Sequence, residues 1–68
     1  MDKEALYRKM EEAGYSIRDM YEALGISRSA FYRKCNGLSE FTLGEILKMM
    51  ALLKVKDPYT IFFNGKVS

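Results

Sequence analysis

Sixty-eight residues can form one small domain, which excludes a catalytic domain with a separate substrate domain. Apolar residues make up 49% of the chain and aromatic residues 13%, so we expect a folded core rather than a disordered chain. The net charge is only +2, and one cysteine with no histidine excludes an internal disulfide and a Cys/His zinc site, so we expect no metal and no other cofactor.

The first 25 residues predict two helices. The first begins at Asp2, a capping acid, and ends at Gly14, which supplies a left-handed residue. The second begins at Ser16, which has capping-box spacing to Asp19, and ends at Gly25. Apolar residues at helical spacing predict the buried faces, which are Leu6, Met10 and Ala13 in the first helix and Ile17, Met20 and Leu24 in the second.

A third helix is expected after a very short turn. Ser27 can accept the N–H groups that open a helix from Arg28 to about Asn36, and Gly37 ends it. Its buried side consists of Ala30, Phe31 and Cys35. Its exposed side consists of Arg28, Ser29, Tyr32, Arg33 and Asn36.

Two further helices are expected in the last third of the chain. Thr42 and Glu45 have capping-box spacing and open a fourth helix, with a buried face formed by Leu43, Ile46, Leu47, Met50 and Leu53. Asp57-Pro58 places a capping acid before a proline, which predicts a short fifth helix over Tyr59–Phe63, closed by Asn64-Gly65. A strand with an Asn-Gly hairpin is the competing interpretation, but three residues after the turn are too few for a return strand.

Positive charge is concentrated in one short part of the chain. Residues 26–39 contain three basic and no acidic residues, whereas residues 1–25 carry a net charge of −2 and residues 40–68 a net charge of +1. No carboxylate occurs from Ala23 to Ser39. A polyanion approaching this stretch would meet no local repulsion.

Two short helices joined by Gly25-Ile26-Ser27 have the spacing of a helix-turn-helix. The matching positions are Met20, Leu24, Gly25, Ile26, Phe31 and Asn36-Gly37. On these residues the segment is similar to the helix-turn-helix of phage repressor and Cro proteins, the XRE family. The resemblance implies an all-α fold, a compact five-helix lambda-repressor-like DNA-binding domain over residues 1–68. Its helix-turn-helix spans about residues 16–37 and is formed by helices 2 and 3.

Two positions depart from the family pattern. Ile17 stands where the family often has a glutamine that caps the second helix and contacts a phosphate. Tyr21 occupies the place that is usually alanine or glycine, where the two helices cross closely. We expect Tyr21 to lean to the edge with its hydroxyl in water, which leaves the crossing angle of the helices open.

Candidate DNA contacts follow from the exposed side of the third helix. Polar and forked side chains near its start can reach base edges, and these are Arg28, Ser29, Tyr32 and Arg33. The ring of Tyr32 could lie against a thymine methyl group. Residues at helix ends and in the following loop are candidate phosphate contacts: Ser16, Ser27, Lys34, Asn36, Ser39 and Thr42. Helix capping alone explains Ser16 and Thr42 equally well.

These features predict a sequence-specific double-stranded DNA-binding transcriptional regulator, a phage or prophage repressor or Cro-like protein that occludes a promoter. No catalytic constellation is present, because Glu11 and Glu12 lie on different sides of a helix end, so we expect no enzyme. The lone cysteine and the lack of a leader or long apolar run predict a cytoplasmic protein, nucleoid-associated when bound to DNA, with no membrane or small-molecule partner. The alternative is an antitoxin-like or adaptor protein that uses the same fold mainly for protein–protein interaction.

Three consecutive apolar residues, Ile61, Phe62 and Phe63, cannot all be buried by one face of a short helix. We expect the exposed part of these three side chains to form the contact of a homodimer. This dimer would form at least on DNA and bind a two-fold symmetric operator. The alternative is that Phe62 or Phe63 folds back and closes the domain's own core.

Overall fold

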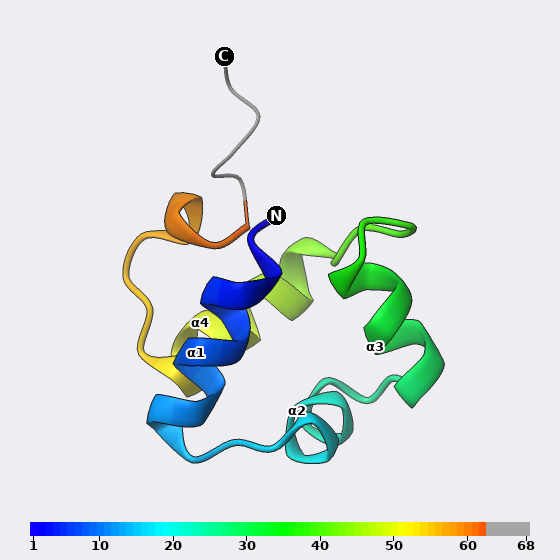
Figure 1. Cartoon of the computed structure of the whole chain (residues 1–68), viewed down its shortest axis with the longest axis horizontal. Helices are drawn as coiled ribbons and strands as arrows, with labels where there is room; N and C mark the ends of the chain where they lie inside the picture. The colour runs from blue at the N-terminus through cyan, green and yellow to red at the C-terminus, as the bar shows by residue number, and fades with distance from the viewer. Residues whose placement is uncertain (63–68) are drawn as a thin grey trace.

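The computed structural model describes residues 1–62. It contains the helices α1 (Lys3–Ala13), α2 (Ile17–Leu24), α3 (Arg28–Cys35) and α4 (Leu43–Leu53), then a single 3₁₀ turn, η1 (Pro58–Thr60), and no strand within the described part. In Figure 1, α4 lies behind α1, α2 lies below them, and α3 stands at the edge of the molecule. α4 packs against both α1 and α2, and α2 packs against α3.

Each α-helix begins at the capping residue that its sequence predicts. The N-cap side chains of Asp2, Ser16, Ser27 and Thr42 each accept a backbone N–H three residues further on. Ser16 and Thr42 belong to complete capping boxes with Asp19 and Glu45. The left-handed conformations of Gly14 and Gly25, with φ of 80° and 72°, end α1 and α2. These boundaries are therefore confirmed.

The core lies between the four helices. Its buried residues are Leu6, Met10, Met20, Phe31, Cys35, Ile46, Met49, Leu53, Val55, Ile61 and Phe62. The ring of Phe41 joins two of them, because it meets Phe31 and Phe62 edge to face at centroid distances of 6.0 and 6.2 Å. Phe31 thereby anchors α3 in the centre of the domain.

The predicted buried face of α4 was partly wrong. Ile46 and Leu53 are buried as expected, but the side chains of Leu43 and Leu47 are 71% and 54% exposed. Met49, about 200° around the helix from Leu47, is fully buried instead. The other helices cover only the stripe that contains Ile46, Met49 and Leu53, so the leucines on the other side remain in solvent.

The predicted fifth helix over Tyr59–Phe63 was also wrong, since the described chain has four α-helices and a single 3₁₀ turn at this point. Asp57 caps the turn by accepting the N–H of Tyr59, as expected. The Ile61 carbonyl then accepts the N–H of Asp2 at 2.7 Å, so it bonds to the start of α1 rather than continuing a helix. Phe63 and Asn64-Gly65 lie outside the described residues.

Ile61 and Phe62 are 1% and 7% exposed, so neither side chain is left over at the surface. The expected apolar patch is therefore wrong for these two residues, and the alternative of core closure holds for Phe62. The physical reason is that the chain after the turn bonds to Asp2 at the start of α1, and the ring of Phe62 meets that of Phe41 in the loop before α4.

Candidate nucleic-acid interface

A tight turn sets α3 against α2. The N–H of Gly25 bonds to the Tyr21 and Glu22 carbonyls, and the N–H of Ile26 bonds to the Tyr21 carbonyl at 3.1 Å. A Cβ at Gly25 would meet nothing within 4 Å, so its left-handed φ, rather than lack of space, favours glycine there. Ser27 then accepts the N–H of Ala30 and opens α3, so that only Gly25 and Ile26 lie between the last residue of α2 and this N-cap.

α3 presents one side to the core and the other to solvent. Phe31 and Cys35 are buried, whereas Arg28, Ser29 and Arg33 are exposed. Figure 1 shows that no other helix covers the outer side of α3 in this view. Three of the four predicted base-contacting residues are thus exposed, with Ser29 and Arg33 on the outer side of α3 and Arg28 at its first residue.

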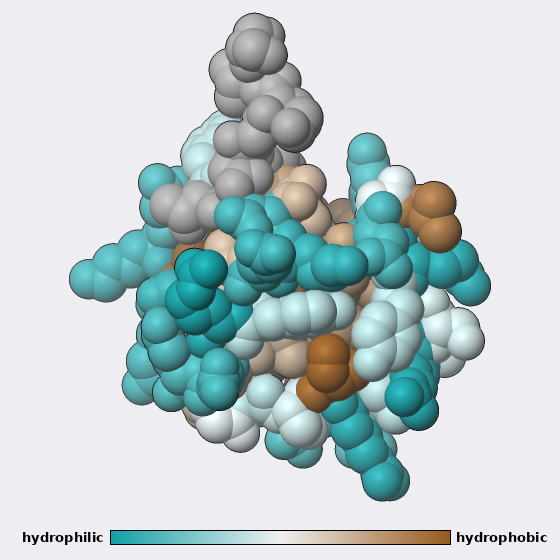
Figure 2. Space-filling model, in the orientation of Figure 1, coloured by the Kyte–Doolittle hydropathy of each residue, from teal (hydrophilic) through white to brown (hydrophobic). Residues whose placement is uncertain are grey.

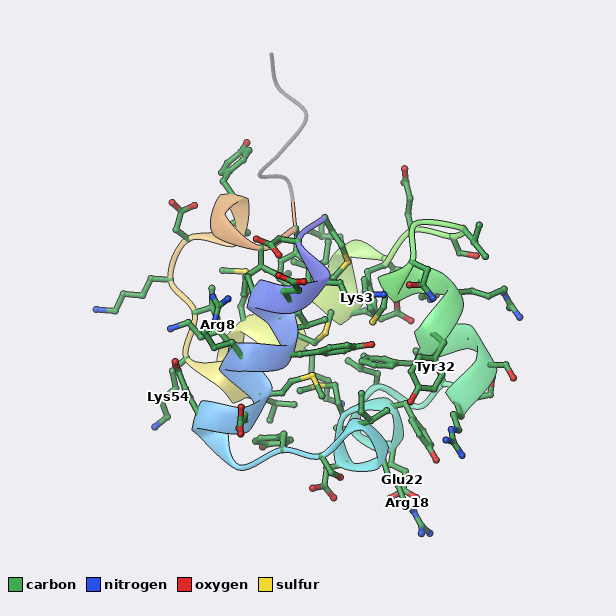
Figure 3. The ribbon with its side chains drawn as sticks, in the orientation of Figure 1. Lys3, Arg8, Arg18, Glu22, Tyr32 and Lys54 are labelled. Atoms are coloured by element: carbon green, nitrogen blue, oxygen red, sulfur yellow. The ribbon has the colours of Figure 1, made fainter. Side chains whose placement is uncertain are left out.

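Tyr32, the fourth of these residues, is only half exposed. Its ring meets the Phe31 ring edge to face at 6.2 Å and an interplanar angle of 70°. The guanidinium carbon of Arg28 lies 5.8 Å from the centroid of the Tyr32 ring. Figure 3 shows Tyr32 on the side of α3 that faces α2 and the middle of the molecule. The structure therefore places this ring beside Arg28 rather than out on the open face.

Side chains of α1 hold the C-terminal end of α3. Lys3 Nζ donates to Asn36 Oδ1 at 2.7 Å, and in Figure 3 Lys3 extends from α1 toward α3. Burial, together with the adjacent Cys35 thiol, raises the pKa of Tyr7 to about 12. Burial also raises the pKa of the Cys35 thiol, which keeps it protonated and makes it a packing residue.

Lys34 is paired within the domain. Its ammonium donates to both carboxylate oxygens of Glu45 at 2.8 and 2.9 Å, and the two side chains are 15% and 14% exposed. It also lies 5.9 Å from the centroid of the Phe41 ring. Burial alone would raise the pKa of Glu45, but hydrogen bonds from Lys34 and Thr42 outweigh it, so the pKa is lowered. Lys34 thus links α3 to α4, and its predicted phosphate contact stays untested.

The other predicted phosphate contacts lie at the ends of α2, α3 and α4 and in the loop before α4. Ser16, Ser27 and Thr42 are exposed, and their hydroxyls already accept capping bonds. Asn36 is exposed beside Lys3, and Ser39 is half-buried in the loop before α4. Their phosphate contacts stay predictions.

Sequence analysis did not single out Arg18, an exposed cation of α2. Its Nε donates to Glu22 Oε2 at 2.9 Å, and in Figure 3 the pair projects from α2 away from the body of the domain. Its i,i+4 spacing to Glu22 could have identified the pair. The two atypical positions Ile17 and Tyr21 are both half-buried and pack against the core, and α2 still packs on α3.

Residues 5–62 match the model of the Cro/C1-type HTH DNA-binding domain. The chain belongs to this family. The match extends over α2, α3 and both flanking helices, which confirms the resemblance seen in the sequence and makes the protein a DNA-binding transcription regulator. No curated protein and no solved structure is significantly similar to the chain. Within residues 1–62, every helix is too short or too polar to cross a membrane.

Proposed function

We propose that this Cro/C1-type protein is a sequence-specific repressor of the phage or prophage kind, which acts by occluding a promoter. The observation that carries the proposal is the open face of α3, where Arg28, Ser29 and Arg33 are exposed and no carboxylate occurs within the helix. Forked cations on such a face can bond to guanine edges, and the missing acids remove repulsion from phosphates.

The positions of the two arginines support different contacts. Arg28 is the first residue of α3 and lies where a recognition helix first meets base edges. Arg33 is five residues further on, about 140° around the helix, and reaches a base or the nearest phosphate. Ser16 and Ser27, at the N-termini of α2 and α3, would direct backbone N–H groups at phosphates. Lys34 contributes less, because Glu45 already neutralises it.

A homodimer on a two-fold symmetric operator is part of the proposal. A single recognition helix contacts only a few base pairs, and two helices related by a two-fold axis multiply specificity. Of the predicted dimer contacts, Ile61 and Phe62 are core residues, and Phe63 lies outside the described part of the chain. The dimer is tested by selecting a bound site from random DNA and measuring, by mass in solution, how many chains bind to that site.

The alternative function is that of an antitoxin-like or adaptor protein whose main partner is another protein. Such a partner would require an apolar exposed surface on α3. The exposed leucines are instead Leu38, in the loop before α4, and Leu43 and Leu47 of α4. The basic outer face of α3 therefore favours DNA.

Selection of bound sequences from random DNA tests the proposal first, followed by affinity measurements on the selected site and on unrelated DNA. Replacing Arg28 by Ala should cost about 1–3 kcal/mol on the selected site and little on unrelated DNA. Lys48→Ala is the matched control, because Lys48 is an exposed cation of α4. Equal losses on both DNAs for Arg28→Ala would mean that Arg28 only neutralises phosphate and reads no base.

Salt dependence gives a second test. Each neutralised phosphate contributes about −0.9 to the slope of log K against log salt, so a phosphate contact by Arg33 predicts a slope of roughly −1 per subunit, to which a base contact by Arg28 adds little. Replacing Lys34 and Glu45 together by Gln should leave this slope unchanged, because their two charges cancel in the native chain. Affinity independent of salt would remove DNA as the partner and favour the adaptor.

A further inference from the structure

Arg28 has an aromatic neighbour on its own helix. Its guanidinium carbon lies 5.8 Å from the centroid of the Tyr32 ring, within the range of a cation–π contact. The two residues are four positions apart, so they lie one above the other on α3. Arg28 forms no salt bridge with any residue of 1–62, so the ring is the contact that restrains its guanidinium.

The core holds this ring in place. Tyr32 is half-buried and meets Phe31 edge to face at 6.2 Å, and Phe31 itself is fully buried. Figure 3 shows Tyr32 directed toward the middle of the molecule. A chain of contacts therefore runs from the rigid core through Phe31 and Tyr32 to the exposed Arg28.

We propose that Tyr32 is a positioning residue, whose ring orients Arg28 for base recognition instead of contacting DNA itself. This inference rests on the proposed function. A guanidinium that is already stacked loses less conformational freedom when it binds a guanine edge, so the ring increases affinity without touching DNA. Arg33 has no cation–π contact among residues 1–62 and serves as the internal comparison.

A double-mutant cycle on the DNA site selected by the native chain tests this role. Tyr32→Leu removes the ring and should weaken binding by about three- to fivefold, the size of an exposed cation–π contact. Tyr32→Phe keeps the ring and should bind within about twofold of the native chain, since the hydroxyl is not required. In the Arg28→Ala background, Tyr32→Leu should have no further effect. In the Arg33→Ala background, its full effect should remain.

A measurement on the free protein separates positioning from folding. In NMR spectra the Arg28 side-chain protons should be shifted upfield by the ring current in the native chain and in Tyr32→Phe, and should lose that shift in Tyr32→Leu. Native-like backbone spectra of Tyr32→Leu would show that α3 is intact.

Two results would overturn the inference. The first is that Tyr32→Leu weakens DNA binding in the Arg28→Ala background as much as it does in the native chain, which would show a direct contact between Tyr32 and DNA. The second is an unshifted Arg28 side chain in the native protein, which would show that no stacking occurs. A native chain that selects no DNA sequence would instead remove the proposed function, and the positioning role with it, whatever the spectra show.

Discussion

α3 and α4 begin in nearly the same way. Ser27 and Thr42 are hydroxyl N-caps that each accept a backbone N–H at 3.1 Å. In α4 the residue that donates this N–H is Glu45, whose carboxylate completes the capping box and places a negative charge at the helix start. In α3 the corresponding residue is Ala30, and the first turn has no acid. The partial positive charge at the start of α3 is thus left for an external anion.

The outer faces of the two helices differ as well. The exposed side of α3 carries Arg28, Ser29 and Arg33, whereas that of α4 carries one cation, Lys48, beside Leu43 and Leu47. The face drawn in Figure 2 is largely hydrophilic, with apolar side chains only in small separate areas. Each helix needs only one buried stripe for stability, so the other side is free to differ. On α3 the other side carries the arginines that the proposed function assigns to DNA.

The largest expected effect is the difference in stability loss between a substitution on the buried side of α3 and one on the exposed side of α4. Phe31→Ala should lower the free energy of unfolding by about 3–5 kcal/mol, because it empties a fully buried site. Since a core of this size supplies only about 3–5 kcal/mol net, most of the variant should be unfolded. Leu47→Ala should change the stability by less than about 0.5 kcal/mol. Urea unfolding of both variants checks this, and a large loss for Leu47→Ala would mean that this side chain is covered.

An acid at the third position of α3, as in α4, should make the N-termini of the two helices alike. Ala30→Glu supplies a capping-box acid for Ser27 at a half-buried position, so the gain from the cap and the cost of burying part of the side chain should change stability by less than about 1 kcal/mol. If α3 enters DNA as proposed, affinity should fall by roughly tenfold or more, because the new carboxylate places a negative charge at the start of this helix. Ala30→Gln makes the same box without the charge and should bind nearly as the native chain does. Undiminished affinity of Ala30→Glu would show that the start of α3 does not approach DNA.

Acid should weaken the link between α3 and α4. The pKa of Glu45 is lower in the folded state than in the unfolded state. Ionised Glu45 therefore stabilises the fold at a pH above its unfolded-state pKa of about 4.3, and this stabilisation is lost as the pH falls through its folded-state pKa. The free energy of unfolding should therefore decrease as the pH is taken from about 5 to 3. In Glu45→Gln this decrease should be smaller, and stability at pH 7 should be lower by about 1 kcal/mol. Identical pH profiles would show that the pair does not stabilise the fold.

The smallest effect concerns how the helices end. α3 is followed by Gly37 with φ of 82°, whereas α4 ends at Lys54, a non-glycine residue with φ of 59°. Lys54→Gly should raise the free energy of unfolding by about 0.5–1 kcal/mol, because glycine adopts this conformation without a Cβ clash. Thermal unfolding measures the change, with Lys56→Gly as the control. A lower stability of Lys54→Gly would mean that the lysine side chain contributes more than its strain costs.

Local signals made much of this fold predictable from the sequence. The four N-caps and the glycines that end α1 and α2 act within about four residues, so their effect is independent of the rest of the chain. The same holds for the open face of α3, because the alternation of Phe31 and Cys35 with polar residues leaves one apolar stripe. The helix-turn-helix and its exposed arginines followed from these signals.

Only the tertiary structure decided which apolar residues of α4 are buried and which cations are available. Apolar residues surround most of α4, so periodicity alone could not choose between the stripe of Met49 and that of Leu47. Lys34 is as basic in the sequence as Arg33, yet the fold brings Glu45, eleven residues away, to its ammonium. The bond from Asp2 to Ile61 likewise joins the two ends of the described chain and buries Phe62. Such contacts depend on where separate helices meet, and no signal within a few residues encodes that position.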